Sequence, residues 1–326
     1  MIRVKLNGIS LSDWTGGYWL GKCPEITLGI SHDSRLIEQG FIFIALSYSK
    51  RDGHDFISDA VKNGAKSCIV EKDCKSSIPQ LVVKDSLKAL EVIARNIREN
   101  FKGNLIAVTG SCGKTSTKDL LTKIIGESDC YSTKGNLNNY LGVPLSLLGL
   151  NKKYKFSVIE AGISEFGEMS QLSYLIKPNI AIFTHIGEAH LKGLISKEKV
   201  AEEKAKLFDY RQSDGLIIAP YDVLKYKAFK KFYSKSILIV NEDILVGFNC
   251  YKKYSYSYKK VNNFLTEVKL ITNSKEFIYS IKSFSRGMVQ NSVLAVVAAI
   301  ENNIKLDKIY CNVRSWKPSV NRGEII

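Results

Sequence analysis

A short glycine-containing segment, Thr109-Gly110-Ser111-Cys112-Gly113-Lys114-Thr115, constrains the fold of this chain more than any other part of its sequence. The apolar run Leu105–Val108 comes before it, and residues 120–125, whose apolar positions have helical spacing, come after it. A glycine loop between a strand and a helix lets backbone N–H groups converge on phosphate oxygens at the helix N-terminus. The pattern therefore predicts an α/β domain built around a phosphate-binding loop.

The side chains of this loop predict nucleotide binding with Mg²⁺. Lys114 would reach the β- and γ-phosphates, and the Thr115 hydroxyl would bind the metal. The loop has the short Gly-x2-Gly-Lys-Thr spacing, because Val108 stands where the longer form has glycine. Glu160 ends an apolar run of strand length, so it can point at the metal from the carboxyl edge of the sheet, and His190 lies just past another such run. A loop Glu is usually solvated and a lone His is more often structural, and the shared position of the two at sheet ends after a phosphate-binding loop favours a functional role about as much.

Apolar runs organise the rest of the chain, whose 326 residues suggest two domains. Residues 1–102 are predicted to form a compact α/β unit with strands at 41–46 and 67–71 and helices at 56–63 and 87–100. Residues 103–326 are predicted to form a mainly parallel sheet with crossover helices, a small antiparallel hairpin around Asn273 and Ser274, and a helix over 291–302. The expected parallel strands are 105–108, 156–159, 180–183, 216–219 and 237–240.

Composition excludes some classes of protein and leaves one question open. No apolar run approaches the ~20 residues that span a bilayer, and the N-terminus lacks a signal-peptide core. Seven Cys without a Cys-x-x-Cys pair argue against disulfides or structural zinc and favour a cytoplasmic protein. The net charge of +15 suits nucleotides as well as nucleic acid. The Lys residues of the densest segment, 221–262, alternate with tyrosines, and we interpret them as a solvated face rather than a nucleic-acid site.

The phosphate-loop sequence and several further segments resemble the Mur ligases, ATP-dependent enzymes that extend the peptide of peptidoglycan precursors. Within that family they resemble the MurF type, which adds D-alanyl-D-alanine. The resemblance covers essentially the whole chain. The supporting segments are 33–35, 52–54, 64–65, 109–116, 133–144, 160–162, 167–168, 186–193 and 200–204.

The resemblance implies a fold and an activity. Residues 1–102 would be the N-terminal α/β domain that holds the UDP end of the substrate, and residues 103–326 the central ATP-binding domain. The family's third, Rossmann-like C-terminal domain would be absent. The activity would be ATP-dependent formation of an acyl phosphate on a UDP-MurNAc-peptide carboxylate, followed by attack of an amine such as that of D-Ala-D-Ala.

The resemblance also implies roles for particular residues. Lys114, His190 and Lys204 would be catalytic, with Lys204 carbamylated, and Thr115, Glu160 and His190 would bind Mg²⁺. The ATP-contacting residues would be Gly110, Ser111, Cys112, Gly113, Lys114, Thr115, Ser116, Asn291 and Arg322. The residues that contact the other substrates would be Ser34, Arg35, Asn138, Asn139 and Ser164.

Three functional hypotheses remain open from the sequence. The first is a MurF-like ligase core that needs a third domain, which a separate chain could supply. The second is a non-catalytic protein that binds a nucleotide or UDP-sugar and acts with a partner. The third, a nucleic-acid-binding P-loop ATPase, rests on net charge alone.

Overall fold

The computed structural model describes residues 3–48, 51–163, 165–187, 196–242, 249–272, 275–283 and 285–317. The chain divides into two compact units. The first unit comprises Met1–Lys102 together with Pro144–Lys152, and the second comprises Gly103–Val143 together with Lys153–Ile326. Helix α5 (Gly142–Leu147) begins in the second unit and continues into the first.

The first unit is built on a five-stranded sheet with the order β1-β7-β6-β3-β2. All neighbouring strands are parallel except β1, which pairs antiparallel with β7. The strands are β1 (Tyr18–Leu20), β2 (Gly29–Ser31), β3 (Phe41–Ile44), β6 (Ser67–Val70) and β7 (Gln80–Val82). A separate short pair is formed by β4 (Ser47–Tyr48) and β5 (Arg51–Asp52).

Both faces of this sheet are buried, as expected for parallel strands. Along β3, Phe41 and Phe43 pack into one core cluster with Ile57 and Ala60 of α2 (Ile57–Lys62), while Ile42 and Ile44 alternate to the other face. The remaining helical elements are α1 (Gly8–Thr15), η1 (Ser34–Leu36), η2 (Gly53–Phe56) and α3 (Ser86–Asn100). The two strands and two helices predicted for this unit are all present, and their boundaries differ from the predicted ones by one or two residues.

The second unit contains a nine-stranded sheet with the order β16-β15-β14-β13-β12-β11-β8-β10-β9. The strands from β9 to β14 are parallel, and β14, β15 and β16 form an antiparallel extension. The parallel strands are β8 (Asn104–Thr109), β9 (Cys130–Ser132), β10 (Phe156–Glu160), β11 (Ile180–Phe183), β12 (Leu216–Pro220), β13 (Ser236–Asn241) and β14 (Lys252–Asn262). The antiparallel strands that follow are β15 (Leu265–Thr272) and β16 (Lys275–Ile281). The mainly parallel sheet and the hairpin agree with the sequence prediction.

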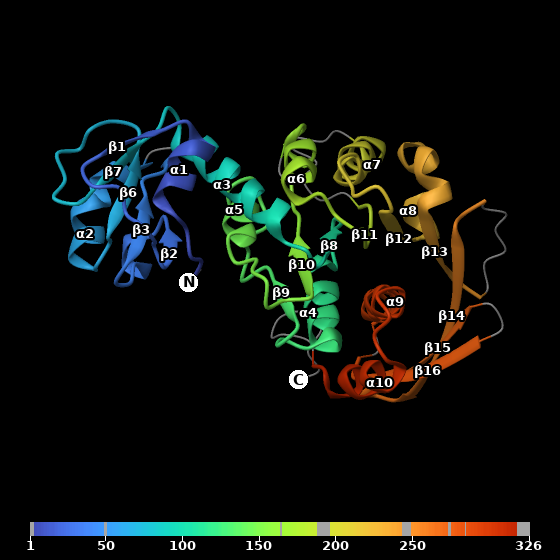
Figure 1. The fold of residues 1–326 in the computed structure, drawn as a ribbon. Helices are drawn as coiled ribbons and strands as arrows, with labels where there is room; N and C mark the ends of the chain where they lie inside the picture. The colour runs from blue at the N-terminus through green and yellow to red at the C-terminus, as the bar shows by residue number, and fades with distance from the viewer. Residues whose placement is uncertain are drawn as a thin grey trace. The chain divides into compact units, whose positions relative to one another are not determined.

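Helices cover both faces of the second sheet. Helices α4 (Lys114–Ile125), α9 (Arg286–Glu301) and α10 (Leu306–Ser315) lie on one side, where they share one hydrophobic core with the strands (Figure 1). On the other side lie α6, α7 and α8 (Figure 1). The elements of that second layer are α6 (Glu168–Ile176), α7 (Lys197–Ala205), η3 (Lys206–Phe208), α8 (Tyr221–Leu224) and η4 (Lys227–Lys235).

Two parts of the second unit differ from the sequence prediction. The Lys- and Tyr-rich segment contains β14, and its side chains at Tyr254 and Tyr256 are buried in the core, with exposed fractions of 0% and 5%. Ser255 and Ser257 are partly exposed, because strand residues alternate between faces, and Lys259–Asn262 at the end of the strand are all exposed. Helix α9 starts at Arg286 rather than Asn291, since the Ser285 side chain accepts a hydrogen bond from Met288 N (3.2 Å) and caps the helix there.

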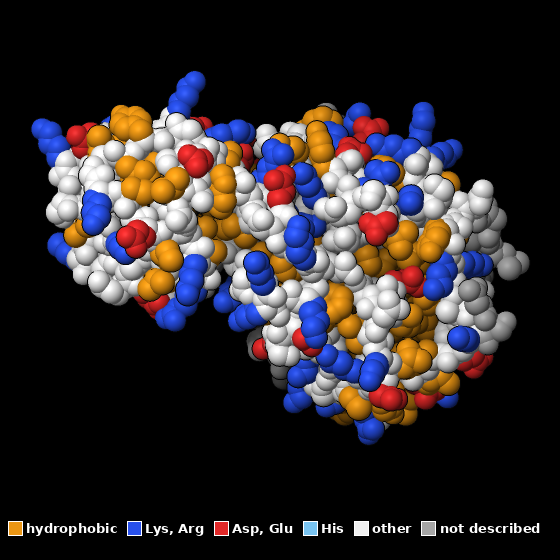
Figure 2. All heavy atoms as spheres, viewed as in Figure 1, with side chains coloured by type: hydrophobic (Ala, Val, Ile, Leu, Met, Phe, Trp, Pro, Cys, Tyr) orange, Lys and Arg blue, Asp and Glu red, His pale blue; other side chains and the backbone are white. Residues whose placement is uncertain are grey.

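Charged side chains of both signs are visible on one face of the protein (Figure 2). On the face shown in Figure 2, Lys and Arg side chains are scattered among acidic and apolar ones rather than gathered into one stripe. All seven cysteines are free thiols. Among the described helices, none combines the length and apolar character needed to cross a membrane.

Candidate active site

The phosphate-binding loop connects β8 to α4, as the sequence predicts. Gly113 has a φ of +81°, and a Cβ atom there would clash with Asn291 Oδ1 of α9, so only glycine fits. Gly113 is also the N-cap of α4 and makes no side-chain cap. Gly113 therefore offers the first N–H groups of this 12-residue helix no side-chain acceptor of its own, and the helix dipole adds partial positive charge there. Such a helix start binds anionic oxygens.

Neighbouring strand ends hold the loop in place. The Thr184 hydroxyl lies 2.5 Å from the carbonyl oxygen of Cys112, and Ser111 N donates to His185 O at 2.8 Å. The Ser111 hydroxyl accepts from Gly187 N (2.9 Å) and lies 3.2 Å from Gly187 O. The loop is thus tied to the segment that leaves β11.

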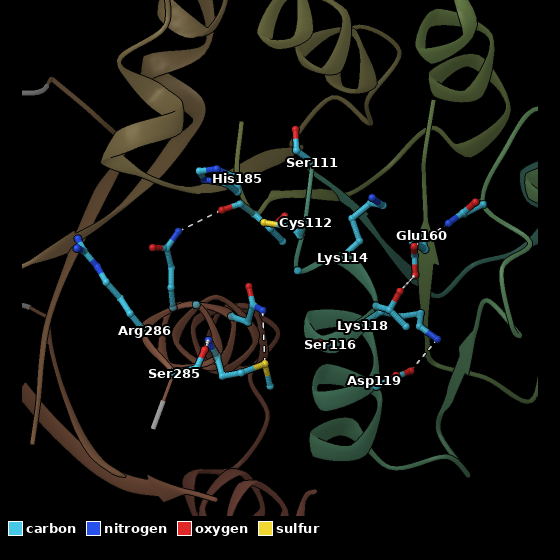
Figure 3. Close-up of a pocket in the computed structure, with 18 of the residues that line it drawn as sticks. Ser111, Cys112, Lys114, Ser116, Lys118, Asp119, Glu160, His185, Ser285 and Arg286 are labelled. Atoms are coloured by element: carbon cyan, nitrogen blue, oxygen red, sulfur yellow. Dashed lines mark hydrogen bonds and ion pairs between the residues drawn. The ribbon is translucent and has the colours of Figure 1, made fainter. Parts of the chain in front are cut away.

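A cavity of about 1130 Å³ opens beside the loop. Figure 3 shows Ser285 and Arg286 of α9 on one side of it and Lys114, Lys118 and Glu160 on the other. The lining side chains come from five places in the chain: the loop and α4, the segment after β9, the ends of β10 and β11, α8, and the start of α9. The lining residues are Ser111–Ser116, Lys118, Asp119, Gly135, Asn136, Asn138, Glu160, Thr184, His185, Asp222, Ser285–Met288, Gln290 and Asn291.

Glu160 is the buried acid of this cavity, with an exposed fraction of 1%. Its Oε2 accepts from the Thr115 hydroxyl at 2.8 Å, and its Oε1 accepts from Asn138 Nδ2 at 2.8 Å. A carboxylate, a hydroxyl and an amide therefore meet at the end of β10. These are the hard oxygen donors that Mg²⁺ prefers, and the ion commonly completes its shell with water and substrate phosphates.

That donor set fits Mg²⁺, which is usually bound by one or two carboxylates together with water and substrate phosphates, better than it fits a metal ion bound entirely by protein side chains. Within the described part of the chain, no three His, Cys, Asp or Glu side chains gather into a metal-binding group. The Lys114 amine donates to Gly110 O (2.9 Å), which keeps it close to the loop, where a phosphate would bind.

Lys204 is an almost fully buried lysine on α7, with an exposed fraction of 1%. Its pKa is lowered from 10.5 to about 7, mainly by burial; the positive charge of Lys114 contributes to the lowering, and the carboxylate of Glu203 opposes it. A large fraction of the amine is therefore neutral near pH 7. A neutral amine is the form that reacts with carbon dioxide, so this residue fits the chemistry of a carbamylated lysine.

In the first unit the predicted substrate residues lie at η1. Ser34 is buried, and its carbonyl oxygen accepts from Asn63 Nδ2 at 3.0 Å. The Arg35 side chain is 85% exposed and pairs with Asp33 at 2.7 Å, which lowers the pKa of that carboxyl. The Arg35 guanidinium therefore lies at the surface, where its Nε and Nη2 both donate to Asp33.

The comparison with known protein families fits both units. Residues 108–299 match the Mur ligase middle domain, and residues 27–106 match the Mur ligase family catalytic domain. The chain belongs to the Mur ligase family. The middle-domain match includes the phosphate-binding loop, Glu160, Lys204 and Asn291.

Individual Mur ligases show the same similarity. The UDP-N-acetylmuramoyl-tripeptide–D-alanyl-D-alanine ligase of Buchnera aphidicola subsp. Baizongia pistaciae is 31% identical over 302 residues, which is 91% of this chain and 64% of the relative. A crystal structure of MurF from Acinetobacter baumannii has a TM-score of 0.88 at 27% identity, covering 98% of this chain and 70% of that one. MurF from Thermotoga maritima, solved in complex with ADP, has the same fold, with a TM-score of 0.74 at 24% identity, covering 89% and 66%. The chain spans just under two thirds of the length of the Buchnera relative.

The fold of this Mur ligase brings most of the predicted site residues together. Ser111, Cys112, Gly113, Lys114, Thr115, Ser116, Asn138, Glu160 and Asn291 all line the cavity. Gly110 contributes the carbonyl oxygen that binds Lys114, and Lys204 lies close enough to Lys114 to be affected by its charge. Asn139 instead caps α5, where its Oδ1 accepts from Gly142 N at 2.8 Å. Ser164, His190 and Arg322 lie outside the described residues.

The sequence did not predict several residues of the cavity. Lys118 and Asp119 follow the loop on α4, and a lysine one helical turn after Lys114 could have suggested the same face. Thr184, Asp222, Arg286 and Gln290 reach the site from three other elements. No local motif marks these four residues, because only the packing of the sheet and of α9 brings them to the cavity.

Proposed function

We propose that this chain carries the ATP site and the UDP-substrate site of a MurF-type ligase. The reaction joins UDP-MurNAc-tripeptide to D-alanyl-D-alanine and converts ATP to ADP and phosphate. The observation that carries the proposal is that Lys114 and the Thr115–Glu160 pair line one cavity, while the buried amine of Lys204 lies near enough to Lys114 to be affected by its charge. Relatives that carry this enzyme name include three that are 31%, 34% and 36% identical to the chain.

The phosphoryl step uses the loop. Lys114 and the first N–H groups of α4 hold the ATP phosphates and neutralise charge as the γ-phosphoryl group moves to the peptide carboxylate. Thr115 and Glu160, together with His190, are the proposed Mg²⁺ ligands. The bound metal would supply further charge neutralisation on the phosphate oxygens. The product is an acyl phosphate and ADP.

The amide forms in a second step. The D-Ala-D-Ala amine attacks the acyl carbon, the C–N bond forms, the bond from that carbon to the phosphate oxygen breaks, and inorganic phosphate leaves. We assign Lys204 to this part of the site as a carbamate, formed when its neutral amine adds carbon dioxide and loses a proton. The support is its low pKa and its position beside Lys114.

Substrate recognition is divided between the two units in this proposal. Ser34 and Arg35 bind the UDP end, and Asn138, Asn139 and Ser164 contact the peptide or the amine. Asn291 and Arg322 contact the nucleotide. The reaction is assigned to the cytoplasm, which the seven free thiols support.

The test is ATP turnover by the 326-residue chain with UDP-MurNAc-tripeptide and D-Ala-D-Ala, with ADP, phosphate and the amide product measured separately. One arm adds the C-terminal domain of a homologous ligase as a separate chain, because about a third of the Buchnera relative lies outside the match. We expect Mg²⁺-dependent ATP binding in both arms and stronger amide formation in the second. Closure of an added domain over half-exposed loop residues excludes water and orients the amine.

Other outcomes would change the proposal. Absence of ATP binding would contradict it. ATP binding without amide formation in either arm would favour a non-catalytic nucleotide- or UDP-sugar-binding protein instead.

A further inference from the structure

We propose that Lys118 is a positioning residue that holds Glu160, and with it the Mg²⁺ site, in a fixed orientation. The inference rests on the nucleotide site of the proposed function and adds a residue to which no role has been assigned above. Lys118 lies one helical turn after Lys114 and Thr115 on α4 and lines the same cavity (Figure 3).

Lys118 is buried and its partners belong to the protein. Its exposed fraction is 5%, its Nζ donates to the carbonyl oxygen of Thr133 at 3.0 Å, and it forms an ion pair with Asp119 at 2.7 Å. Burying an ammonium group is costly unless it is paired and hydrogen-bonded. The two contacts satisfy that requirement and connect α4 to the segment that follows β9.

Thr133 passes this connection on to β10. Its exposed fraction is 1%, and its hydroxyl accepts the backbone N–H of Glu160 at 3.0 Å. Its own N–H donates to Val158 O at 3.1 Å. Thr133 therefore binds both the Lys118 side chain and the backbone at the end of β10.

The Glu160 carboxylate closes the ring. Its Oε2 accepts from the Thr115 hydroxyl, which returns the network to α4 three residues before Lys118. The hydrogen bonds thus run from α4 through Thr133 and Glu160 back to α4. They fix both the backbone and the carboxylate of the residue proposed to bind Mg²⁺. Partners that orient a metal ligand in this way typically change metal affinity by about 10- to 100-fold when they are mutated.

The first measurement is the Mg²⁺ dependence of ATP binding, by titration calorimetry on the whole chain. We expect Lys118→Met and Thr133→Val each to weaken the apparent Mg²⁺ affinity by about tenfold. ATP binding without Mg²⁺ should stay within about twofold of wild type, because neither residue is assigned to the phosphates. Thr133→Ser keeps the hydroxyl, and Lys123→Met removes an exposed lysine from the same helix, so both controls should resemble wild type.

The second measurement needs no ligand. Hydrogen exchange of the Glu160 amide, read by NMR, should become at least about tenfold faster in Lys118→Met and Thr133→Val and should not change in the two controls. Unchanged exchange and an unchanged Mg²⁺ constant in Lys118→Met would overturn the assignment of Lys118. So would an equal loss of ATP binding with and without Mg²⁺, which would mean direct phosphate contact. If wild type bound no ATP, the proposed function would fail, and the exchange measurement would still decide the role of Lys118.

Discussion

At the scale of single residues, the site brings two amines with different tasks close together. Lys114 lies at the phosphate loop, and Lys204 is buried near enough to Lys114 to be affected by its charge, with a pKa of about 7. Two ammonium groups close together repel each other, so the positive charge of Lys114 favours the neutral form of the Lys204 amine. In the proposed reaction, Lys114 would be the cation that binds phosphate and Lys204 the amine that adds carbon dioxide.

Replacing Lys114 by Ala is expected to abolish measurable Mg-ATP binding. The variant loses a charged hydrogen-bond donor, which is worth about 3 kcal/mol, or more than about 100-fold in affinity. Titration calorimetry on the wild type and on Lys114→Ala checks this, with Lys123→Ala on the same helix as the control. Equal affinity of the variant and the wild type would contradict the role of Lys114 in the nucleotide site.

Replacing Lys204 by Met is expected to raise the thermal stability at pH 7 and to abolish amide formation. The folded-state pKa of about 7 lies below the unfolded value of about 10.4, so the unfolded chain binds more protons between these values. The wild type therefore becomes more stable relative to Lys204→Met as the pH rises from 7 towards 10. Melting curves in buffer free of carbon dioxide check the trend, and a stability difference that does not change with pH would contradict it.

At the scale of elements, helix α7 is joined to α6 by a buried carboxylate. Glu203 has an exposed fraction of 0%, and its Oε1 accepts from Gly167 N (2.8 Å) and Met169 N (3.1 Å). Gly167, the N-cap of α6, makes no cap with its own side chain, so Glu203 supplies the cap from the other helix. Its other oxygen pairs with Lys206 at 2.6 Å.

Glu203→Ala is expected to lower the free energy of unfolding by about 3 kcal/mol. The variant leaves two helix N–H groups and the partly buried Lys206 ammonium without this acceptor. The neighbouring Glu202 provides the control, because its pair with Lys199 is exposed and Glu202→Ala should cost less than about 1 kcal/mol. Urea unfolding of both variants measures the difference. Similar losses in the two would show that Glu203 does not join the helices.

At the scale of the whole molecule, each unit has its own sheet and its own predicted ligand. The second unit holds the cavity beside the phosphate loop, and the first presents Ser34 and Arg35 at η1. This division predicts that the UDP substrate and ATP leave separate footprints on the chain.

UDP-MurNAc-tripeptide is expected to slow hydrogen exchange within residues 30–60, because a bound nucleotide sugar would cover η1 and its neighbours. Exchange mass spectrometry on the full chain checks this, with peptides from β14 and β15 as the internal reference and free tripeptide as the ligand control. No protection of residues 30–60 at saturating ligand would contradict the substrate assignment of the first unit and leave the nucleotide site unaffected.

The sequence alone determined the features that are encoded locally. The loop between β8 and α4, the parallel strands and the hairpin each have a continuous signature, namely an apolar run, a glycine pair or an alternation of period two. The expectations for Lys114, Thr115 and Glu160 followed because the carboxyl ends of parallel strands share one edge.

Only the tertiary structure decided the features that depend on burial and on contacts between distant segments. Tyr254 and Tyr256 resemble part of a solvated, lysine-rich stretch until the strand places them against α9. Nothing in the residues around Lys204 indicates that its amine is buried, and nothing around Lys118 indicates its contact with Thr133, fifteen residues further along the chain. The sequence determines which side chains carry charge and can form hydrogen bonds. The pKa shifts and hydrogen-bond strengths of these side chains depend on desolvation, which arises only when the chain packs.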